Sequence, residues 1–185
     1  MLRACSRRES ITSLKITMPI TNIKQKFPVT PAIRMLNAAG VEYVGHLYVY
    51  VEKGGTTQIA KELNIDEHKV IKTLIMETDA KKPLVILMHG DRSVSVKELA
   101  RVIGVKSVAP CKPDQADRNS GYKCGGTSPF ATRKQMPVYV ESTILELDTI
   151  YINGGHQGFC LEMKPDVLVQ LLKPIPVNVA IDSLD

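Results

Sequence analysis

Two apolar runs, "KVIKTLIMET" at residues 69–78 and "KPLVILMHGD" at residues 82–91, flank a short polar turn in the middle of the chain. The first run is largely apolar on both faces, which is typical of a strand buried inside a sheet. The turn over Ala80 to Lys82 lets the second run fold back beside the first. We therefore expect a central hairpin, with Lys72 as a charged side chain that interrupts its first strand.

Capping and turn residues outward from this hairpin mark the remaining elements. Thr30 is placed to cap a helix that has Pro31 in its first turn and Gly40 at its end, and Thr56 or Thr57 can cap a second helix. The predicted helices span residues 31–40, 56–65, 93–104, 113–121 and 165–173, and the other predicted strands span residues 41–51, 105–110, 136–143, 148–155 and 158–165. Helices and strands alternate early and strands dominate late, which predicts an α/β (α+β) domain with a mixed sheet.

The domain boundaries follow from length and composition. A chain of 185 residues is long enough for one good core, so we expect a single domain over residues 29–173. Residues 1–28 are predicted to be a flexible extension, with Met18 as an alternative start. Prolines punctuate residues 174–185, which we expect to form a C-terminal tail.

The composition is that of an ordinary globular protein, with 44% hydrophobic and 23% charged residues. No apolar run approaches the roughly 20 residues of a membrane-spanning helix, so we expect no membrane contact and a cytoplasmic location. Four cysteines and four histidines are dispersed along the chain, and we expect free thiols, no metal and no cofactor. A net charge of +5 is a hint of a polyanionic partner, although a solvated surface explains it equally well.

The stretch "GYKCGGTSPF" at residues 121–130 offers two kinds of chemistry. Adjacent Gly125 and Gly126 can bring backbone amides close to a ligand, although a tight turn is the commoner use of such a pair. Cys124 could be a nucleophile only if a base such as His156 lowered the pKa of its thiol, so we expect it to be a small apolar filler. A second pair in "NGGHQG", Gly154 and Gly155, favours a site lined by both glycine loops.

Two further side chains are candidates on physical grounds. Lys72 lies in an apolar strand, where its ammonium must find an anion or reach solvent, so it is predicted to open into a cleft that holds phosphate or carboxylate. The alternative is an outward position on an edge strand. Tyr48 could stack on a base or line a pocket, but packing in the core is the more common role.

Taken together, several motifs in order resemble the YbaK family of aminoacyl-tRNA deacylases over about Thr30 to Leu172. These motifs are "VTPAIRMLNAAGVEY", "HLY", "VIKTLI", "HGD", "GYKCGGTSPF", "LELDTIYINGGHQGF" and "EMKPDVL". The resemblance implies a mixed sheet, partly closed into a barrel and flanked by helices. It implies a catalytic set of Lys72, Gly125, Gly126, Thr127 and Ser128, and substrate-binding roles for Tyr48, Pro129, Gly154 and Gly155.

The sequence departs from the family's pattern near these motifs. The position of Cys124 is usually aliphatic in the family, and His156 with Gln157 stands where basic residues are common. The acid after Pro165 is displaced to Asp166. These departures leave the contacts to the acceptor end and the amino-acid preference open.

The resemblance also implies a reaction and partners. It implies trans-editing of mischarged Cys-tRNA(Pro), with the acceptor end of tRNA(Pro) and prolyl-tRNA synthetase as partners and a monomer or weak dimer as the working form. In the mechanism proposed for the cysteine-specific members, the thiolate of the substrate attacks its own ester and the protein supplies positioning. The alternatives are a deacylase for alanine- or serine-charged tRNA that uses an activated water, and a non-catalytic adaptor for tRNA or synthetase.

Overall fold

The centre of the molecule is an antiparallel hairpin of β2 (Val70–Thr78) and β3 (Pro83–His89), seen in a computed structural model that describes residues 27–183. The two faces of β3 pack into different hydrophobic clusters. Val85 and Leu87 belong to one cluster, and Ile86 and Met88 belong to the other. All four side chains are fully buried, as expected of a strand that is covered on both faces of its sheet.

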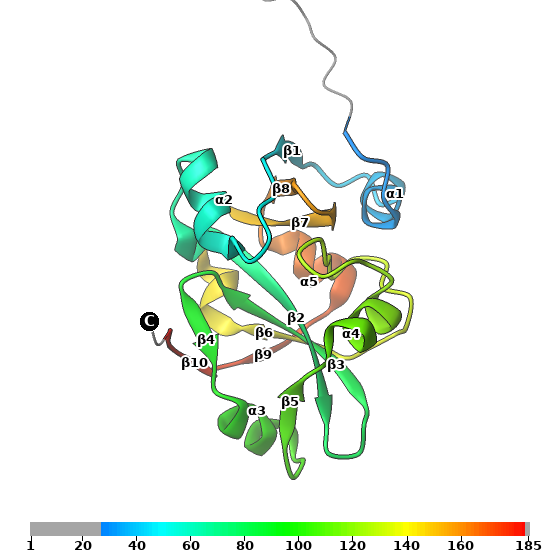
Figure 1. The fold of residues 1–185 in the computed structure, drawn as a ribbon, viewed down its shortest axis with the longest axis vertical. Coiled ribbons are helices and arrows are strands. Elements are labelled where there is room, and N and C mark those ends of the chain that lie inside the picture. The colour runs from blue at the N-terminus through cyan, green and yellow to red at the C-terminus, as the bar shows by residue number, and fades with distance from the viewer. Residues whose placement is uncertain (1–26, 184–185) are drawn as a thin grey trace, which may run out of the picture.

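The hairpin lies inside a mixed sheet with the order β1-β8-β7-β2-β3-β6-β9, in which β5 pairs with β2. The pairs β2–β7, β3–β6 and β6–β9 are parallel, and the others are antiparallel. Figure 1 shows that this sheet twists strongly. The additional strands are β1 (Val44–Leu47), β5 (Val108–Pro110), β6 (Val138–Glu141), β7 (Ile150–His156), β8 (Phe159–Met163) and β9 (Ile175–Val177). The predicted α/β class with a mixed sheet is confirmed.

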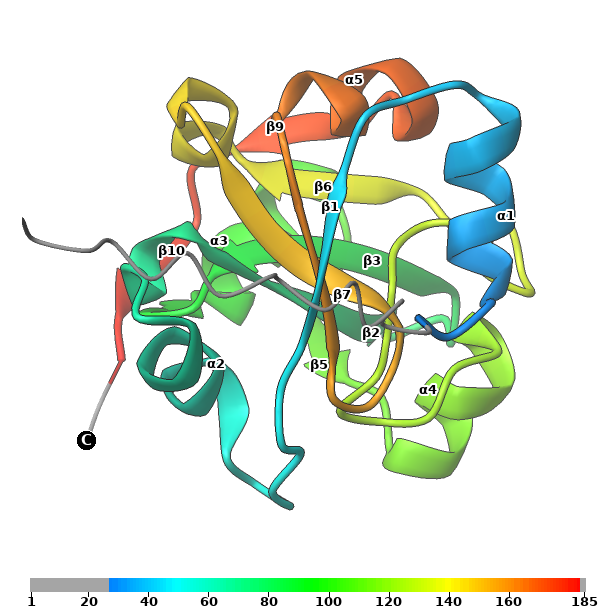
Figure 2. The same ribbon diagram turned by 90° about the horizontal axis from the view of Figure 1, so that it is seen from above.

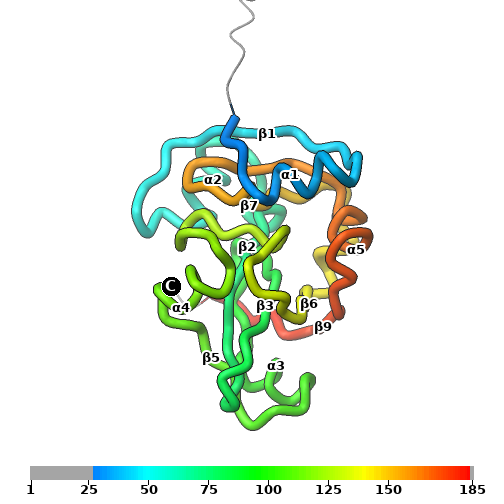
Figure 3. The backbone as a smooth tube through the Cα atoms, turned by 90° about the vertical axis from the view of Figure 1, so that its right-hand side faces the viewer, coloured from blue at the N-terminus to red at the C-terminus, as the bar shows by residue number. Residues whose placement is uncertain are grey.

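Helices spread around this sheet, as Figure 2 shows. They are α1 (Pro31–Ala38), α2 (Gly55–Leu63), α3 (Val96–Ile103), α4 (Pro113–Ser120) and α5 (Asp166–Leu172), with 3₁₀ turns η1 (Glu67–Lys69) and η2 (Ser142–Glu146). The predicted cap of α1 is confirmed, because Thr30 Oγ1 accepts a hydrogen bond from Ile33 N at 3.2 Å. Figures 1 and 3 both place α3 at the end of the molecule far from β1 and β7.

The predicted strand at residues 41–51 is too long at both ends. Only β1 pairs with β8, and its register ends where Leu47 meets Phe159, the first residue of β8. Tyr48 N still donates to the carbonyl oxygen of Gly158 at 2.9 Å, and residues 49–51 then leave the sheet because they have no partner strand. The segment that leaves the sheet borders the cavity described below.

The start of α2 also differs from the prediction. The helix begins at Gly55 with Gly54 at the N-cap, so neither Thr56 nor Thr57 is a capping residue. Both threonine hydroxyls instead donate to Glu67 Oε1, each at 2.8 Å. The two hydroxyls therefore join the start of α2 to η1 instead of capping the helix.

The helix predicted at residues 93–104 begins later than expected. Ser95 is its N-cap, with Oγ accepting from Glu98 N at 3.4 Å, and Gly104 ends α3 in the left-handed conformation. The residues before the cap form β4 (Arg92–Val94), which pairs with β10 (Ala180–Asp182) in a second, two-stranded sheet. The cap residue thus marks the true boundary between strand and helix.

The C-terminal segment predicted as a tail is part of the folded domain. β9 pairs with β6, and β10 pairs with β4. Val177 and Val179 are buried, and Glu141 Oε2 accepts hydrogen bonds from the amides of Val179 and Ala180 at 2.8 and 2.9 Å. These contacts extend the domain past residue 173. Prolines are tolerated in an edge strand, and the burial of the two valines holds this segment on the sheet.

The predicted N-terminal extension and the alternative start at Met18 lie almost wholly outside the described residues. Phe27, the first residue described, stacks on Phe159 with 5.7 Å between ring centroids. None of the helices within residues 27–183 combines the length and the apolar character that crossing a membrane requires.

Candidate functional site

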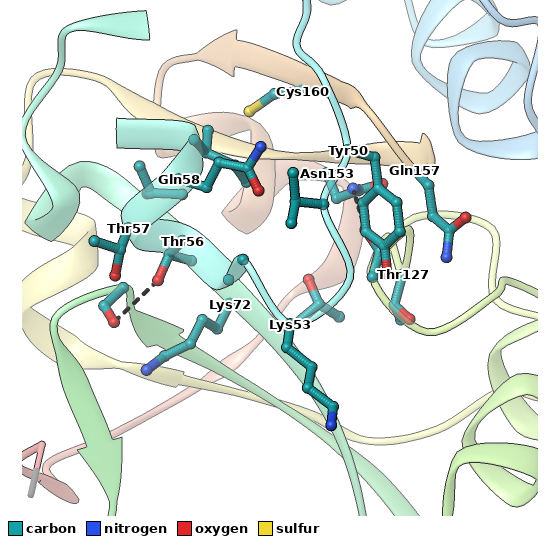
Figure 4. Close-up of a pocket in the computed structure, with 18 of the residues that line it drawn as sticks. Tyr50, Lys53, Thr56, Thr57, Gln58, Lys72, Thr127, Asn153, Gln157 and Cys160 are labelled. Atoms are coloured by element: carbon teal, nitrogen blue, oxygen red, sulfur yellow. Dashed lines mark hydrogen bonds between the residues drawn. The ribbon is translucent and has the colours of Figure 1, made fainter. Parts of the chain in front are cut away.

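A cavity of about 1280 Å³ opens between α2, β2, the turn that joins β7 to β8, and the loop at residues 121–130. Figure 4 shows side chains from all of these segments around it. Of the predicted site residues, Tyr48, Lys72, Gly125 and Thr127 line the cavity. Residues that are far apart in the sequence therefore meet at one place, as the two glycine loops and the strand lysine predict.

Lys72 extends from β2 into this cavity and is half-buried. Its ammonium donates to the carbonyl oxygen of Arg92. Burial lowers the pKa of Lys72, and the carboxylates of Glu67 and Asp91 oppose this shift only in part. An ammonium has three donors, so two remain to hold an anionic ligand after the bond to Arg92.

The two glycine loops contact each other through Gly126. A Cβ at this position would lie 2.7 Å from the backbone nitrogen of Gln157, so only glycine allows the loops to approach so closely. Gly126 N already donates to the carbonyl oxygen of Lys123 at 2.8 Å, and Gly126 is buried outside the cavity lining. Gly126 therefore joins the two loops and its amide is engaged within its own loop, and its predicted catalytic role stays a prediction.

The neighbours of Gly126 remain open to the cavity. Gly125 adopts φ of +82°, and a Cβ there would lie 2.6 Å from the hydroxyl oxygen of Tyr50. Both the left-handed backbone and this close contact require glycine. Among residues 27–183 the amides of Gly125 and Thr127 have no backbone acceptor, so they are the donors that the loop presents. Figure 4 shows the Tyr50 ring beside Thr127.

Four of the predicted site residues lie behind the cavity wall. Ser128 and Pro129 are buried, and Ser128 Oγ has no hydrogen-bond partner in the part of the chain that the structure describes. Gly154 O accepts from Thr30 Oγ1 at 2.5 Å, and a Cβ at Gly155 would lie 2.6 Å from the Tyr122 ring. None of the four lines the cavity, and their predicted catalytic and substrate-binding roles stay predictions.

The aromatic residues after β1 form one wall. Burial raises the pKa of Tyr48 to about 12, and the exposed Tyr50 stands at the rim. Lys53 follows at the edge of the same wall, and Figure 4 shows the side chains of Lys53 and Lys72 extending toward the same side of the cavity. Packing in the core is therefore not the only role of Tyr48, because its ring also borders the cavity.

Cys124 is exposed at the cavity rim, so the prediction of a buried filler is wrong. Partial burial of the thiol and the nearby carboxylate of Asp117 raise the pKa of Cys124 to about 11. His156 Nδ1 lies 2.6 Å from the carbonyl oxygen of Gln157. A thiol with this pKa is almost wholly protonated at neutral pH, which disfavours a nucleophilic role.

Sequence reasoning missed several cavity residues. Asn153 Nδ2 donates to the carbonyl oxygen of Gly125 at 3.3 Å, and Gln157 Nε2 donates to that of Cys124 at 2.8 Å. The side chains of Asn153 and Gln157 lie on either side of the second glycine pair in the sequence. The motif that contains this pair is therefore the feature of the sequence that points to them. Asp166 lies in the first turn of α5 and outside the cavity lining.

The closed end of the cavity is apolar. Ile59, Val70 and Cys160 belong to one buried cluster, and Tyr48 packs against it. Figure 4 shows Cys160 above the other labelled side chains, where it lines the cavity although its side chain is 1% exposed. Burial raises the pKa of this thiol to about 12. Among residues 27–183, this end of the cavity therefore carries no charged group.

Within residues 27–183, no group of three His, Cys, Asp or Glu side chains is arranged to hold a metal ion.

Comparison with known proteins identifies the family. The model of the aminoacyl-tRNA editing domain matches residues 53–171, which is more than half of the chain. The candidate Cys-tRNA(Pro)/Cys-tRNA(Cys) deacylase EbsC of Enterococcus faecalis is 27% identical over 143 residues, which cover 77% of this chain and 87% of EbsC. A proline–tRNA ligase of Thermodesulfovibrio yellowstonii is 26% identical over 106 residues, which cover 57% of this chain and 18% of the ligase.

Solved structures share the fold. A crystal structure described as a candidate trans-editing enzyme for prolyl-tRNA synthetase superposes with a TM-score of 0.71 at 16% identity, covering 83% of this chain and 99% of the other. The crystal structure of a hypothetical protein superposes with a TM-score of 0.75 at 20% identity, covering 82% and 100%.

Proposed function

Because the chain belongs to the aminoacyl-tRNA editing domain family, we propose that it is a trans-editing deacylase that removes cysteine from mischarged Cys-tRNA(Pro). The observation that carries this proposal is the meeting of Lys72, the open amides of Gly125 and Thr127, and an apolar stretch of lining in one cavity. A terminal aminoacylated adenosine presents matching groups, namely phosphate, an ester carbonyl and an amino-acid side chain.

The closed end of the cavity supports a small amino acid. Ile59, Val70 and Cys160 offer apolar surface without a charged group, so a short and uncharged side chain is accommodated best. A synthetase pocket shaped for proline cannot strongly exclude small competitors, because the loss of a methylene group changes the binding free energy only modestly. A separate hydrolytic site for such errors is therefore useful.

Attack by the substrate's own thiolate fits the properties of Cys124. In this step a bond forms between the substrate sulfur and its carbonyl carbon, and the ester bond to the ribose oxygen breaks. The proton lost by the thiol ends on the ribose hydroxyl, and water later opens the cyclic thioester to free cysteine. The step needs no thiol from the protein, which agrees with a Cys124 pKa of about 11. An intramolecular attack held in the right geometry can reach effective molarities of roughly 10⁵ M or more.

The protein's own groups would orient the ester. The amides of Gly125 and Thr127 can donate to the carbonyl oxygen as negative charge develops on it. Lys72 can hold the terminal phosphate or ribose with the donors that Arg92 leaves free. Tyr48 and Tyr50 supply ring surface on which the terminal base can rest.

The proposed partners follow from the reaction. The acceptor end of tRNA(Pro) is the substrate, and prolyl-tRNA synthetase, the source of the mischarged tRNA, is expected to act nearby in the cytoplasm. A region of proline–tRNA ligases is similar to this chain, which is consistent with a shared substrate. We propose a monomer or weak dimer as the working form.

A deacylation assay tests the proposal. Purified protein is incubated with Cys-, Ala-, Ser- or Pro-tRNA(Pro), and release of the amino acid is followed over time. We expect fast release of cysteine and retention of proline. Release of alanine or serine, but not of cysteine, would indicate that an activated water attacks the ester instead of the thiol of the substrate. Binding of tRNA without release of any amino acid would favour a non-catalytic adaptor.

A further inference from the structure

A second, smaller depression lies where α4 ends and the glycine loop at residues 121–130 begins. It measures about 190 Å³, and its charged lining consists of Arg118 from α4, Lys123 from the glycine loop, Arg133 from the following segment, and Asp117. Three cations thus share this depression with one carboxylate. The excess of positive charge in a space of this size fits a phosphate group.

The backbone holds these cations together. The chain after the glycine loop returns to the end of α4, where Arg133 N donates to the carbonyl oxygen of Ser120 and Lys134 N donates to that of Asn119, both at 2.9 Å. The Cβ of Arg133 would lie 3.2 Å from a Cβ built on Gly121. Arg133 is therefore fixed against the end of the helix that carries Arg118.

The single carboxylate does not neutralise the depression. Asp117 Oδ1 accepts the amide hydrogen of Cys124 at 2.9 Å, and its other oxygen lies 3.7 Å from the Lys123 ammonium. Among the ion pairs within residues 27–183, none includes Arg118 or Arg133. Both guanidinium groups can therefore bind an external anion, and a guanidinium matches two phosphate oxygens at once.

The depression and the proposed site are lined by neighbouring residues of one loop. Lys123 precedes Gly125 by two residues, a separation of at most about 7 Å along an extended chain. The bond from Cys124 to Asp117 links the same loop to α4. A nucleic acid strand whose last nucleotide enters the cavity would carry its preceding phosphates past this point, since each nucleotide adds one phosphate.

We propose that Arg118, Lys123 and Arg133 form a docking site for backbone phosphates of the RNA strand that precedes the aminoacylated nucleotide. This inference rests on the proposed function and names the surface that receives the acceptor strand. Contacts to phosphates carry no sequence information, so the docking site positions the strand and leaves selection of the amino acid to the cavity.

Binding of deacylated RNA tests the docking site without any requirement for catalysis. The double variant Arg118→Ala/Arg133→Ala is compared with the wild type by fluorescence anisotropy, using deacylated tRNA(Pro) and a minihelix of its acceptor stem. We expect about tenfold weaker binding at low salt, because two phosphate contacts are lost. We also expect the slope of log K against log salt to fall by about 1.5, because each lost contact contributes about 0.7 to 0.9.

Two matched variants complete the experiment. Lys97→Ala/Arg101→Ala removes the same charge from exposed positions on α3, at the far end of the molecule in Figure 1, and is expected to bind RNA like the wild type. Arg118→Lys/Arg133→Lys retains the charge and is expected to recover most of the affinity. An equal loss of RNA affinity in the α3 variant would show that affinity depends only on the net charge of the protein. This result would overturn the docking site.

The outcomes separate this inference from the proposed function. Wild-type affinity and salt dependence in the double alanine variant would overturn the docking site even if deacylation is fast. Failure of the wild type to bind either RNA would overturn it as well. Conversely, weakened binding in this variant would support the docking site even if the wild type releases no amino acid, an outcome that contradicts only the proposed function.

Discussion

Gln157 Nε2 donates a hydrogen bond to the carbonyl oxygen of Cys124 at 2.8 Å, and this bond joins the turn between β7 and β8 to the loop that follows α4. Asn153 Nδ2 supports it by donating to the carbonyl oxygen of Gly125 at 3.3 Å. The two carbonyl oxygens thus have side-chain partners, while the amides of Gly125 and Thr127 have no backbone acceptor among residues 27–183. The position of these two amides therefore depends on a hydrogen bond from the side chain of Gln157, which belongs to a distant part of the chain.

Gln157→Ala is expected to slow deacylation about five- to tenfold, because the loop loses a hydrogen bond worth roughly 1 kcal/mol that holds its amides in place. The measurement is kcat/KM for Cys-tRNA(Pro), together with the midpoint of thermal unfolding. Gln170→Ala makes the same change at an exposed position of α5 and serves as the control. Equal activity of the Gln157 and Gln170 variants would show that the loop holds its shape without this bond.

Lys72→Ala is expected to lower deacylation about a hundredfold, the usual cost of removing one donor from a charged reaction site. Stability is expected to change little, because the loss of the bond to Arg92 is offset by relief of a half-buried charge. Lys69→Ala is the control, since its ammonium pairs with Asp148 at 2.7 Å and does not line the cavity. Near-normal turnover of the Lys72 variant would remove this lysine from the site.

The sequence predicted the central elements well because their signals are local and strong. The two apolar runs predict a buried hairpin that includes Lys72. The two glycine pairs predict both loops of the site. The end of β1 depended on where its partner β8 starts, which is a contact between segments far apart in the sequence. The bond from Gly126 N to the carbonyl oxygen of Lys123 is local, but it depends on the exact conformation of the loop, which the residue types alone do not fix.

Cys124→Ala is expected to retain most of the deacylation activity. The thiol has a pKa of about 11, so its thiolate at neutral pH is roughly a hundredfold scarcer than that of an ordinary cysteine. Alkylation of Cys124 by iodoacetamide, followed by mass spectrometry, should accordingly be slow at pH 7.5 and should accelerate until the pH approaches 11. A rate that reaches its plateau below pH 9, or loss of activity in a folded Cys124→Ala protein, would restore Cys124 as a candidate nucleophile.

Cys160→Val is expected to alter amino-acid preference, because it adds about one methyl group to the closed end of the cavity. The ratio of kcat/KM for cysteine-charged over alanine-charged tRNA should fall about tenfold, the usual effect of one methylene group in a tight pocket. Cys160→Ala should leave this ratio near that of the wild type or raise it. Using a ratio cancels any general loss of folded protein, and an unchanged ratio in both variants would place the amino-acid side chain elsewhere.

Alkaline pH is expected to destabilise the fold through two buried tyrosines. Burial raises the pKa of Tyr48 and of Tyr122 to about 12, and the hydroxyl of Tyr122 donates to the carbonyl oxygen of Phe130 at 2.7 Å. In the unfolded chain both phenols ionise near their ordinary pKa of about 10. Between about pH 10 and 12 the unfolded state therefore binds fewer protons than the folded state, so the free energy of unfolding decreases as the pH rises.

The stabilisation is complete below about pH 10 and is lost as the pH rises through about 12, at a cost of about 3 kcal/mol for the buried Tyr122 and less for Tyr48, whose partial exposure to solvent screens the effect. Urea denaturation at pH 8, 9, 10 and 11 measures this decrease. In Tyr48→Phe the decrease should be smaller by the share of one phenol, whereas Tyr139→Phe, which changes a residue of β6 that does not line the cavity, should follow the wild type. Parallel curves for the wild type and Tyr48→Phe would mean that the Tyr48 hydroxyl ionises as easily in the folded protein as in the unfolded chain.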